Sequence, residues 1–391
     1  VVDDHTVRFI FTNRYPYQLM DANEGVILPK HLLEEIPRDS IRTANFGQRP
    51  VGNGPFRLSK WVHGQYIALE RNPAYYEKGK PRLDRVVWRI LPDITTLVTQ
   101  LKLGEIDCLE SIPLDALEDI EANHPEIKIH RFQSRGMTFI AWNLQNPIFA
   151  DAEIRRALGF ALNGSEIIQT LWRGLAEPAA GPMPPILWAH DPSLEPLPFD
   201  PNRAIRMLNA AGWADSDGDG ILDKDGRAFE FSMTANQGAQ VRIDVLTMVQ
   251  AQLRRIGIRV KPQVLEFNTF IDQIVLGEFE SCVMGWKVDE RPDLTRFWRS
   301  DATPPTGFNL SRYNNPRVDQ LIDEARNTTD TETARSLWYE CQRIIYDDQP
   351  IYFLAVPYEI LAVHERFCNV RPNGIGTFVN LRDWYVSNDC P

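Results

Sequence analysis

Apolar and polar positions follow two periods along this chain, one typical of strands and one of helices. Residues 229–235 alternate at every second position, as a half-buried strand does. Residues 151–162 instead place Ile154, Ala157, Leu158 and Ala161 on one face, the spacing of an amphipathic helix. On these criteria we expect strands at residues 6–11, 56–61, 66–71, 86–91, 106–109, 136–144, 229–235, 258–264, 282–288 and 351–363, and helices at residues 32–36, 95–103, 151–162, 202–211, 240–255, 267–276, 315–326 and 330–346.

Two stretches of the chain have a predicted strand on each side of a predicted helix. The first covers residues 86–109 and the second covers residues 229–264. A strand–helix–strand order is typical of a parallel crossover, so we expect at least one sheet to be partly parallel. The fold class that follows is α/β, with mixed sheets and flanking helices.

Size and charge narrow the class of protein. At 391 residues the chain is too long for one hydrophobic core, which predicts two or three lobes. Its net charge is −11, with acids and bases interspersed, so we expect no nucleic-acid partner, because phosphate binding needs a basic face. We find no apolar run long enough to span a membrane, and residues 1–5 are too polar for a signal peptide. If the protein is exported, its signal is not in this sequence.

The five cysteines leave two interpretations open. They are scattered, without a CxxC pair or a histidine at zinc-ligand spacing. One interpretation is that all five are small buried apolar residues. The other is a single disulfide, between Cys368 and Cys390, in an oxidising compartment.

Catalytic patterns are lacking in the sequence. It has no GxSxG elbow, P-loop, GxGxxG between a strand and a helix, or HExxH, and its seven histidines are isolated. Neighbouring carboxylates such as Asp347 and Asp348 point in different directions in a helix, so they are poor candidates for an acid/base pair. We therefore expect no enzyme and no catalytic residue, with a hydrolase acting in a cleft as the alternative from another class.

One segment has metal-ligand spacing. Asp215, Asp217 and Asp219 alternate, Gly220 follows, and Asp223 comes next, as in the first half of an EF-hand calcium loop. Gly226 stands where that loop needs a bidentate Glu. The segment is therefore interpreted either as a structural calcium site away from the ligand or as a solvated turn. No other cofactor is expected.

Several segments match a known family in order and spacing. The stretch from residue 51 to 107 resembles the family 5 solute-binding proteins of bacterial ABC importers, the group of oligopeptide, dipeptide and nickel receptors. The matching segments are residues 51–56 (VGNGPF), 69–76 (LERNPAYY), 103–107 (LGEID), 143–147 with 155–157, 211–213 with the Asp/Gly loop, 253–260 (LRRIGIRV), 314–316 and 349–352.

The resemblance implies a two-lobed periplasmic-binding-protein fold of the second type, in the large variety with an extra lobe. On that basis residues 1–50 are expected to be a remnant of the small extra lobe and residues 51–135 part of lobe I. Residues 136–365 would form lobe II, and residues 366–391 would return to lobe I. On the same basis we expect that the family's usual N-terminal segment, which supplies one wall of the cleft, is not in this sequence.

The resemblance also implies a function. The protein would be a monomeric receptor, periplasmic or extracellular and membrane-anchored, that captures peptides by hinge closure and delivers them to the transmembrane subunits of an ABC permease. An oligosaccharide or nickel receptor of the same family is the alternative, and a regulatory or chaperone-like binding protein would use the same cleft.

The segment from Gly285 to Asp289 is the main candidate for the ligand site. It is predicted to be a strand that ends in an acidic stretch, and a strand at a cleft can pair with an extended peptide through its backbone. Alternation places Gly285, Lys287 and Asp289 on one side of the strand and Trp286 on the other. The resemblance implies that Asp289, three residues after Trp286, binds the α-ammonium group of a peptide by a charge-assisted hydrogen bond.

Three further residues are candidates for ligand contacts. Asn236 ends a predicted strand before a long helix, where a helix N-terminus can reach an anion. Arg242, one turn into that helix, is a candidate for binding a ligand carboxylate. Trp142 and Trp286 are candidates for stacking on a ligand, with burial in the core as the alternative.

Overall fold

The computed structural model describes residues 1–25 and 27–387. The chain divides into two compact units. Unit 1 comprises residues 1–19 and 133–358, and unit 2 comprises residues 20–132 and 359–391. This division does not test the predicted extra lobe at residues 1–50, which stays a prediction.

Unit 1 is built on a six-stranded mixed sheet with the strand order β11-β10-β12-β6-β13-β7. Its strands are β6 (Gly136–Trp142), β7 (Ala176–Pro178), β10 (Glu230–Asn236), β11 (Arg259–Leu265), β12 (Ser281–Lys287) and β13 (Ile351–Pro357), with the small hairpin β8 (Asp223–Lys224) and β9 (Arg227–Ala228) beside them. Its helices are α5 (Ala152–Ala161), α6 (Gly164–Trp172), α7 (Pro201–Ala210), α8 (Gln240–Arg254), α9 (Phe267–Leu276), α10 (Thr295–Trp298), α11 (Pro316–Asn327) and α12 (Thr331–Asp348).

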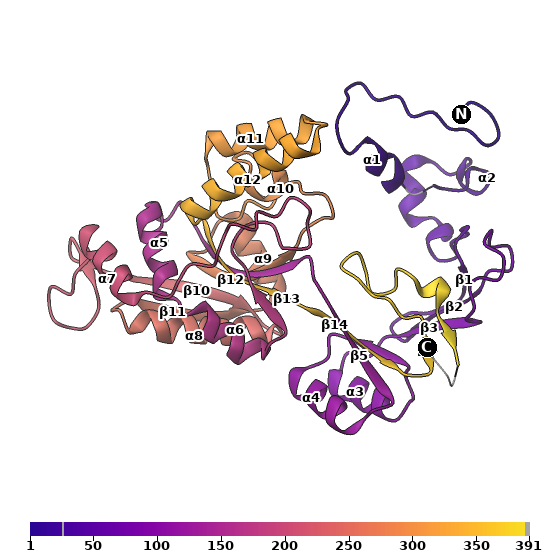
Figure 1. Cartoon of the computed structure of the whole chain (residues 1–391), viewed down its shortest axis with the longest axis horizontal. Helices are drawn as coiled ribbons and strands as arrows, with labels where there is room; N and C mark the ends of the chain where they lie inside the picture. Colours follow the sequence, from indigo (N-terminus) through magenta and orange to yellow (C-terminus); the bar gives the residue numbers. More distant parts are fainter. Residues whose placement is uncertain (26, 388–391) are drawn as a thin grey trace. The chain divides into compact units, whose positions relative to one another are not determined.

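The second predicted strand–helix–strand unit is confirmed. β10 and β11 pair in parallel from Glu230↔Arg259 to Asn236↔Leu265, with α8 as the crossover between them. From β11 the chain passes through α9 to β12, which pairs in parallel with the other side of β10. In Figure 1, α8 and α9 lie on opposite faces of this sheet. The carboxyl ends of β10, β11 and β12 therefore share one edge, the place where open α/β sheets bind ligands.

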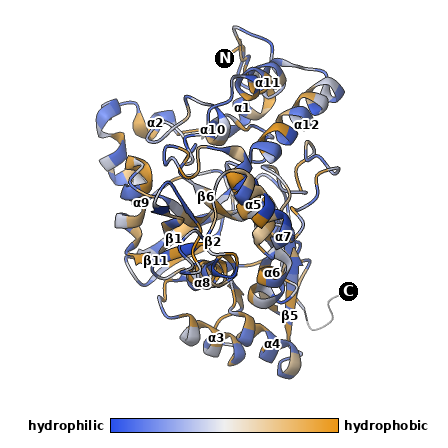
Figure 2. Cartoon of the chain, turned by 90° about the vertical axis from the view of Figure 1, so that its left-hand side faces the viewer, coloured by the Kyte–Doolittle hydropathy of each residue, from blue (hydrophilic) through white to orange (hydrophobic). Residues whose placement is uncertain are grey.

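Amphipathic helices and an aromatic cluster form the core of unit 1. The predicted helix at residues 151–162 is α5, where the Asp151 side chain accepts the Glu153 N–H and Ile154 and Leu158 are buried. The long helices carry both hydrophilic and hydrophobic residues, as Figure 2 shows, so one face of each can pack inward. Trp298 and Phe139 are among the buried core residues.

Unit 2 contains two separate three-stranded sheets, with the strand orders β1-β2-β3 and β4-β14-β5. Its strands are β1 (Phe56–Val62), β2 (Tyr66–Arg71), β3 (Arg85–Arg89), β4 (Cys108–Glu110), β5 (Ile127–Phe132), β14 (Glu359–His364), β15 (Phe367–Cys368) and β16 (Tyr385–Val386). Its helices are α2 (Lys30–Leu33), α3 (Ile94–Lys102) and α4 (Leu114–Asn123), with the 3-10 turns η1 (Arg38–Thr43), η2 (Asn45–Gly47) and η3 (Leu381–Asp383), while α1 (Gln18–Glu24) spans the boundary with unit 1.

Two sequence predictions are wrong in detail. The first predicted strand–helix–strand unit does form as β3, α3 and β4, but β3 and β4 belong to different sheets. The apolar period predicts where the strands and the helix of such a unit lie. It does not predict which sheet each strand joins. The expected strand at residues 6–11 is also not formed. Among the described residues, its one pairing is an isolated bridge between Asp3 and Thr6. An alternating pattern needs a partner strand, and these residues pair with none among the described ones.

The chain passes between the units through two neighbouring pairs of strands. β5 leads into β6, and β13 leads into β14. β6 pairs antiparallel with β13 in unit 1, and β5 pairs antiparallel with β14 in unit 2. The entry and exit strands of residues 133–358 are therefore neighbours in the sheet.

Each of the two interpretations of the cysteines holds for some of the described ones. Cys108, Cys282 and Cys341 are free, and the last two are buried. Cys368 takes part in a disulfide. Cys390, the partner expected from the sequence, lies outside the described residues. None of the described helices is long and apolar enough to cross a membrane.

Candidate ligand site

The predicted strand of the ligand site lies in the interior of the unit 1 sheet but keeps part of one edge free. β12 pairs with β6 along its whole length, from Ser281↔Trp142 to Lys287↔Gly136. On its other side the pairing with β10 covers only Ser281 and Cys282. Beyond that point β10 stays with β11, so the two strands part. From residue 283 to 286 the β10-facing edge of β12 has no ladder partner among the described residues.

Gly285 lies in the middle of this free edge. A Cβ atom added to it would lie 2.7 Å from the carbonyl oxygen of Met137 on β6 and 3.6 Å from Nη2 of Arg242. The first distance is shorter than van der Waals contact, so this position needs glycine for a close backbone approach. The second distance places the Arg242 guanidinium on the face of β12 that Gly285 leaves open.

Asn236 and Arg242 are brought together with Gly285. Arg242 Nη1 donates to Asn236 Oδ1 over 2.9 Å, which joins the end of β10 to the first turn of α8. Burial lowers the pKa of the Arg242 guanidinium. No carboxylate among the described residues forms an ion pair with it.

Lys287 and Asp289 continue the same segment and are exposed. The backbone beyond β12 is held by Arg135, since the Val288 N–H donates to the Arg135 carbonyl over 3.0 Å and Arg135 Nη1 donates back to the Val288 carbonyl over 3.1 Å. We call Asn236, Arg242, Gly285, Lys287 and Asp289 the strand-edge corner. Sequence reasoning missed Arg135, which carries no signal because it is an isolated arginine before a strand.

The two tryptophans predicted to stack on a ligand both pack against core residues. Trp142 is 0% exposed and stacks on Phe149 with 5.2 Å between the ring centroids. It has no surface left for a ligand, so the core alternative holds. Trp286 lies on the face of β12 opposite Gly285, where its ring is 4.1 Å from Phe139 and 4.5 Å from Phe297. The prediction that Trp142 contacts a ligand is therefore wrong. Trp286 is only partly buried, so its contact with a ligand stays a prediction.

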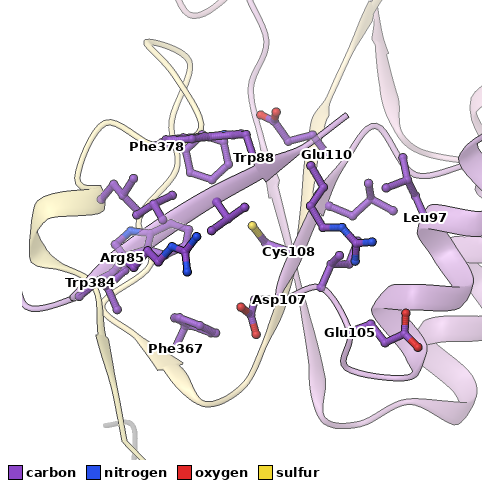
Figure 3. Close-up of a pocket in the computed structure, with 17 residues that line it drawn as sticks. Arg85, Trp88, Leu97, Glu105, Asp107, Cys108, Glu110, Phe367, Phe378 and Trp384 are labelled. Atoms are coloured by element: carbon purple, nitrogen blue, oxygen red, sulfur yellow. The ribbon is translucent and has the colours of Figure 1, made fainter. Parts of the chain in front are cut away.

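Unit 2 contains a hollow of a different kind, which sequence reasoning missed. It has a volume of about 510 Å³ and lies between β3 and β4, with aromatic residues along its wall. Figure 3 shows Cys108 between these strands, with Trp88 and Phe378 close together. Burial raises the pKa of the Cys108 thiol to about 12, so this sulfur stays protonated and is a poor nucleophile. We call it the aromatic hollow; its wall includes Val87, Trp88, Cys108, Phe367, Phe378 and Trp384.

The predicted calcium loop gathers three of its four carboxylates. Oxygens of Asp215, Asp217 and Asp223 lie within 4.8 Å of one another. Asp219 is outside this group, because its carboxylate accepts the Ile221 N–H and lies 3.6 Å from Arg259. Asp215 accepts the backbone N–H groups of residues 218 and 220, which holds the turn without an ion. Both interpretations of the segment remain, and calcium stays a prediction.

Comparisons with known proteins agree with the resemblance found in the sequence. Residues 1–307 match the model of the middle region of bacterial extracellular solute-binding proteins, family 5. The oligopeptide-binding protein AppA of Bacillus subtilis (strain 168) is 33% identical over 366 residues, which are 92% of this chain and 67% of AppA. The glutathione-binding protein GsiB of Salmonella choleraesuis (strain SC-B67) is 27% identical over 379 residues, 94% of this chain and 69% of GsiB.

Solved structures show the same fold. AppA of Bacillus subtilis in complex with a nonapeptide matches 96% of this chain and 75% of its own, with a TM-score of 0.80 and 31% identity. NikZ of Campylobacter jejuni in complex with Ni(L-His) matches 95% of this chain and 75% of its own, with a TM-score of 0.82 and 27% identity. The mixed α/β architecture is thus that of the periplasmic binding proteins, and the predicted solute-binding role is the one this family performs. The chain belongs to the bacterial extracellular solute-binding proteins of family 5.

Proposed function

We propose that the protein is the receptor of an ABC importer that captures peptides and delivers them to a membrane permease from the extracellular or periplasmic side. The free edge of β12 is the observation that carries the proposal. It offers backbone N–H and C=O groups to an extended peptide, and such bonds do not depend on the peptide's sequence. That AppA is an oligopeptide-binding protein and has been solved with a nonapeptide supports this ligand class.

Asp289 supplies the anchor in this proposal. It is exposed at the end of the β12 segment, and Gly285 and Lys287 precede it at alternate positions. A carboxylate that accepts a hydrogen bond from a peptide ammonium forms a charge-assisted bond and fixes which peptide residue pairs with which strand residue. Closure of two lobes on the ligand, a monomeric state and the permease partner stay predictions.

Native mass spectrometry of the purified protein tests the ligand class, because it identifies what co-purifies. Peptides are the expected ligand. A bound oligosaccharide would overturn the peptide proposal while leaving the receptor role intact. A bound nickel complex, as in NikZ, would do the same, although none of the five residues of the strand-edge corner is a histidine.

The anchor is tested with Asp289→Asn. We expect peptide affinity to fall at least about thirtyfold, since truncation of one partner of a charged pair costs about 2 kcal/mol or more. N-acetylation of the peptide should produce the same loss in the unaltered protein and no further loss in the variant. Glu278→Gln is the matched control, because this carboxylate of unit 1 is also exposed and lies before β12. Unchanged affinity of Asp289→Asn, measured by titration calorimetry, would remove Asp289 from the site.

A further inference from the structure

Unit 2 contains a second cavity, about 520 Å³ in volume, whose wall is mainly polar and basic. We call it the basic pocket and define it by five residues of its wall, Arg82, Lys128, His130, Arg371 and Tyr385. All five belong to unit 2, so the pocket shares no residue with the strand-edge corner. Its volume lies within the range of cavities that hold small organic ligands, about 300–1,000 Å³.

The three cations of the basic pocket come from three separate segments of the chain. Lys128 lies on β5, two residues before His130, so the two side chains share one face of this outer strand. Arg82 precedes β3, and its guanidinium carbon lies 4.9 Å from the centre of the Tyr385 ring on β16. Arg371 belongs to the segment that follows β15. Positive charge therefore reaches this cavity from several directions.

The cations of the basic pocket lack counter-charges, in contrast with the carboxylate in the same wall. Asp383 pairs with Lys80 over 2.7 Å and has the Arg382 Nε at 3.8 Å, so its charge is already compensated. Among the described residues, none of the three cations of the pocket forms an ion pair. In a chain with a net charge of −11, such a group of like charges is unusual. Their mutual repulsion would be relieved by a bound anion.

His130 adds a hydrogen-bond donor to the basic pocket. Burial and, to a smaller extent, repulsion from Lys128 lower the pKa of His130 below its ordinary value of 6.5. The imidazole is therefore mainly neutral at pH 7, where one of its ring nitrogens carries a hydrogen and can donate it. A neutral donor can bind an anion without adding to the repulsion among the cations.

We propose that the basic pocket binds the phosphate group of an organic phosphate ester. A phosphate monoester carries about −1.5 to −2 charges and three acceptor oxygens. Cations that approach from three segments fit such a group better than they fit a planar carboxylate. A guanidinium forms paired hydrogen bonds with phosphate, and the Tyr385 ring holds that of Arg82 in place.

The wall of the basic pocket also has room for the rest of the ester. Phe367 and Val370 contribute apolar surface to it, on which the carbon-containing part of the ligand can pack. Either a soluble molecule or a lipid headgroup carries the required phosphate. Phosphate binding at this place is independent of peptide capture, because it uses no residue of the strand-edge corner.

Titration calorimetry of the purified full chain with glycerol 3-phosphate tests the proposal. Succinate is the comparison ligand, because it is a dianion without phosphate. We expect the phosphate ester to bind about tenfold or more tightly than succinate, and Arg82→Gln and Lys128→Gln each to lower its affinity about tenfold. Arg89→Gln removes an exposed arginine of β3 outside the pocket wall. It should leave the affinity unchanged at physiological salt, where screening acts over about 8 Å.

Vesicle co-sedimentation distinguishes the two sources of phosphate. Phosphatidylcholine vesicles are compared with and without phosphatidic acid, a lipid that carries a phosphate monoester. Binding that requires phosphatidic acid and is lost in Arg82→Gln supports the pocket and assigns it to a lipid headgroup. Binding of glycerol 3-phosphate without binding to these vesicles supports the pocket and assigns it to a soluble ester.

Three results would overturn phosphate binding at this pocket. They are that neither phosphate ligand binds, that succinate binds as tightly as glycerol 3-phosphate, or that Arg89→Gln loses as much affinity as Arg82→Gln and Lys128→Gln. Equal thermal unfolding midpoints show that the variants keep the fold, as expected for exposed side chains. None of these results bears on the peptide function, whose own test is the ligand that co-purifies with the protein.

Discussion

The strand-edge corner of unit 1 and the aromatic hollow of unit 2 are both places where a strand lacks a neighbour, yet they have opposite chemistry. At the corner, β12 has a free edge beside a glycine, a partly buried arginine and an exposed carboxylate. At the hollow, β3 and β4 are edge strands, and the exposed residues include Val87 at 43% and Trp88 at 37%.

The difference shows what makes a free edge specific. Both places offer backbone hydrogen bonds, and the wall of the hollow also includes charged side chains such as Arg85 and Glu110. At the corner, Gly285 gives a ligand close access to the free strand edge, and Asp289 beyond the end of β12 can fix the direction of that ligand. The hollow offers mainly apolar surface, which attracts any apolar group. We therefore assign solute recognition to the corner.

The largest expected effect is a difference in lost unfolding free energy between a substitution in the core behind the corner and one in the wall of the hollow. Trp298 is 1% exposed and contacts Trp286, Tyr313 and Phe353. Trp298→Ala should therefore destabilise the protein by about 3–5 kcal/mol. Trp88→Ala should cost less, about 1–2 kcal/mol, because Trp88 is 37% exposed and already partly solvated. Urea unfolding measures both. Equal losses would show that the hollow is as tightly packed as the core.

The next effect concerns the glycine of the corner. Gly285→Ala forces a Cβ to within 2.7 Å of the Met137 carbonyl, so we expect about 1–3 kcal/mol of destabilisation together with weaker peptide binding. Gly52→Ala in unit 2 meets no atom within 4 Å and should leave both unchanged. Thermal unfolding and titration calorimetry measure the two quantities. Full affinity and stability in Gly285→Ala would contradict the close approach.

A smaller effect distinguishes the two units by pH. In unit 2, burial and the nearby Lys128 lower the pKa of His130 below its ordinary value of 6.5. The unfolded chain then binds the proton more tightly, so this contribution to stability is fully present above the unfolded pKa of about 6.5 and is lost as pH falls from there through the lowered folded pKa. His130→Gln should flatten this part of the profile by less than about 1 kcal/mol.

Unit 1 should respond to acid in a lower pH range. Burial opposes ionisation of Asp191, but hydrogen bonds from Ser193 and the ion pair with Arg343 outweigh it and hold the pKa of Asp191 below 3.8. The resulting stability is present above pH 3.8 and lost as pH falls through the lowered pKa. Urea midpoints measured between pH 7 and pH 3 test both windows. A profile that is flat from pH 7 to pH 5 in the unaltered protein would contradict the role of His130.

The smallest effect decides between the two interpretations of the Asp/Gly loop. If the group of Asp215, Asp217 and Asp223 binds calcium, saturating calcium should raise the unfolding midpoint by about 2–4 °C relative to chelator. Asp217→Asn should abolish the rise, and Asp219→Asn should keep it, because Asp219 lies outside the group. Equal midpoints in calcium and in chelator would establish the solvated turn.

The sequence predicted elements better than their pairing. Residues 240–255 and 267–276 form the expected helices, because a strong apolar period and a turn residue define each one locally. β3 and β4 were expected in one partly parallel sheet and lie in two, since strand pairing depends on edges far apart in the chain. The sequence pattern of a hairpin or a crossover is the same whichever sheet edge its strands pair with.

The candidate site shows the same limit at the scale of side chains. Gly285 and Lys287, both within β12, are placed on one strand face by alternation alone. The contact between Asn236 and Arg242, six residues apart, depends on how the chain turns from β10 into α8 and has no periodic signal. Trp142 and Trp286 show a second limit. A sequence does not distinguish a tryptophan that stacks on a ligand from one that packs in the core until its neighbours in the fold are known.

The paired strands that connect the units make residues 133–358, which form unit 1 together with residues 1–19, an insertion whose two ends meet. This stretch enters through β6 and leaves through β13, two strands that are hydrogen-bonded neighbours in register Phe139↔Phe353. A segment whose two ends meet in this way can be cut out, joined across a short turn or placed in a loop of another protein without stretching the chain. The strand-edge corner lies wholly within it, so the proposed recognition surface would move together with this segment.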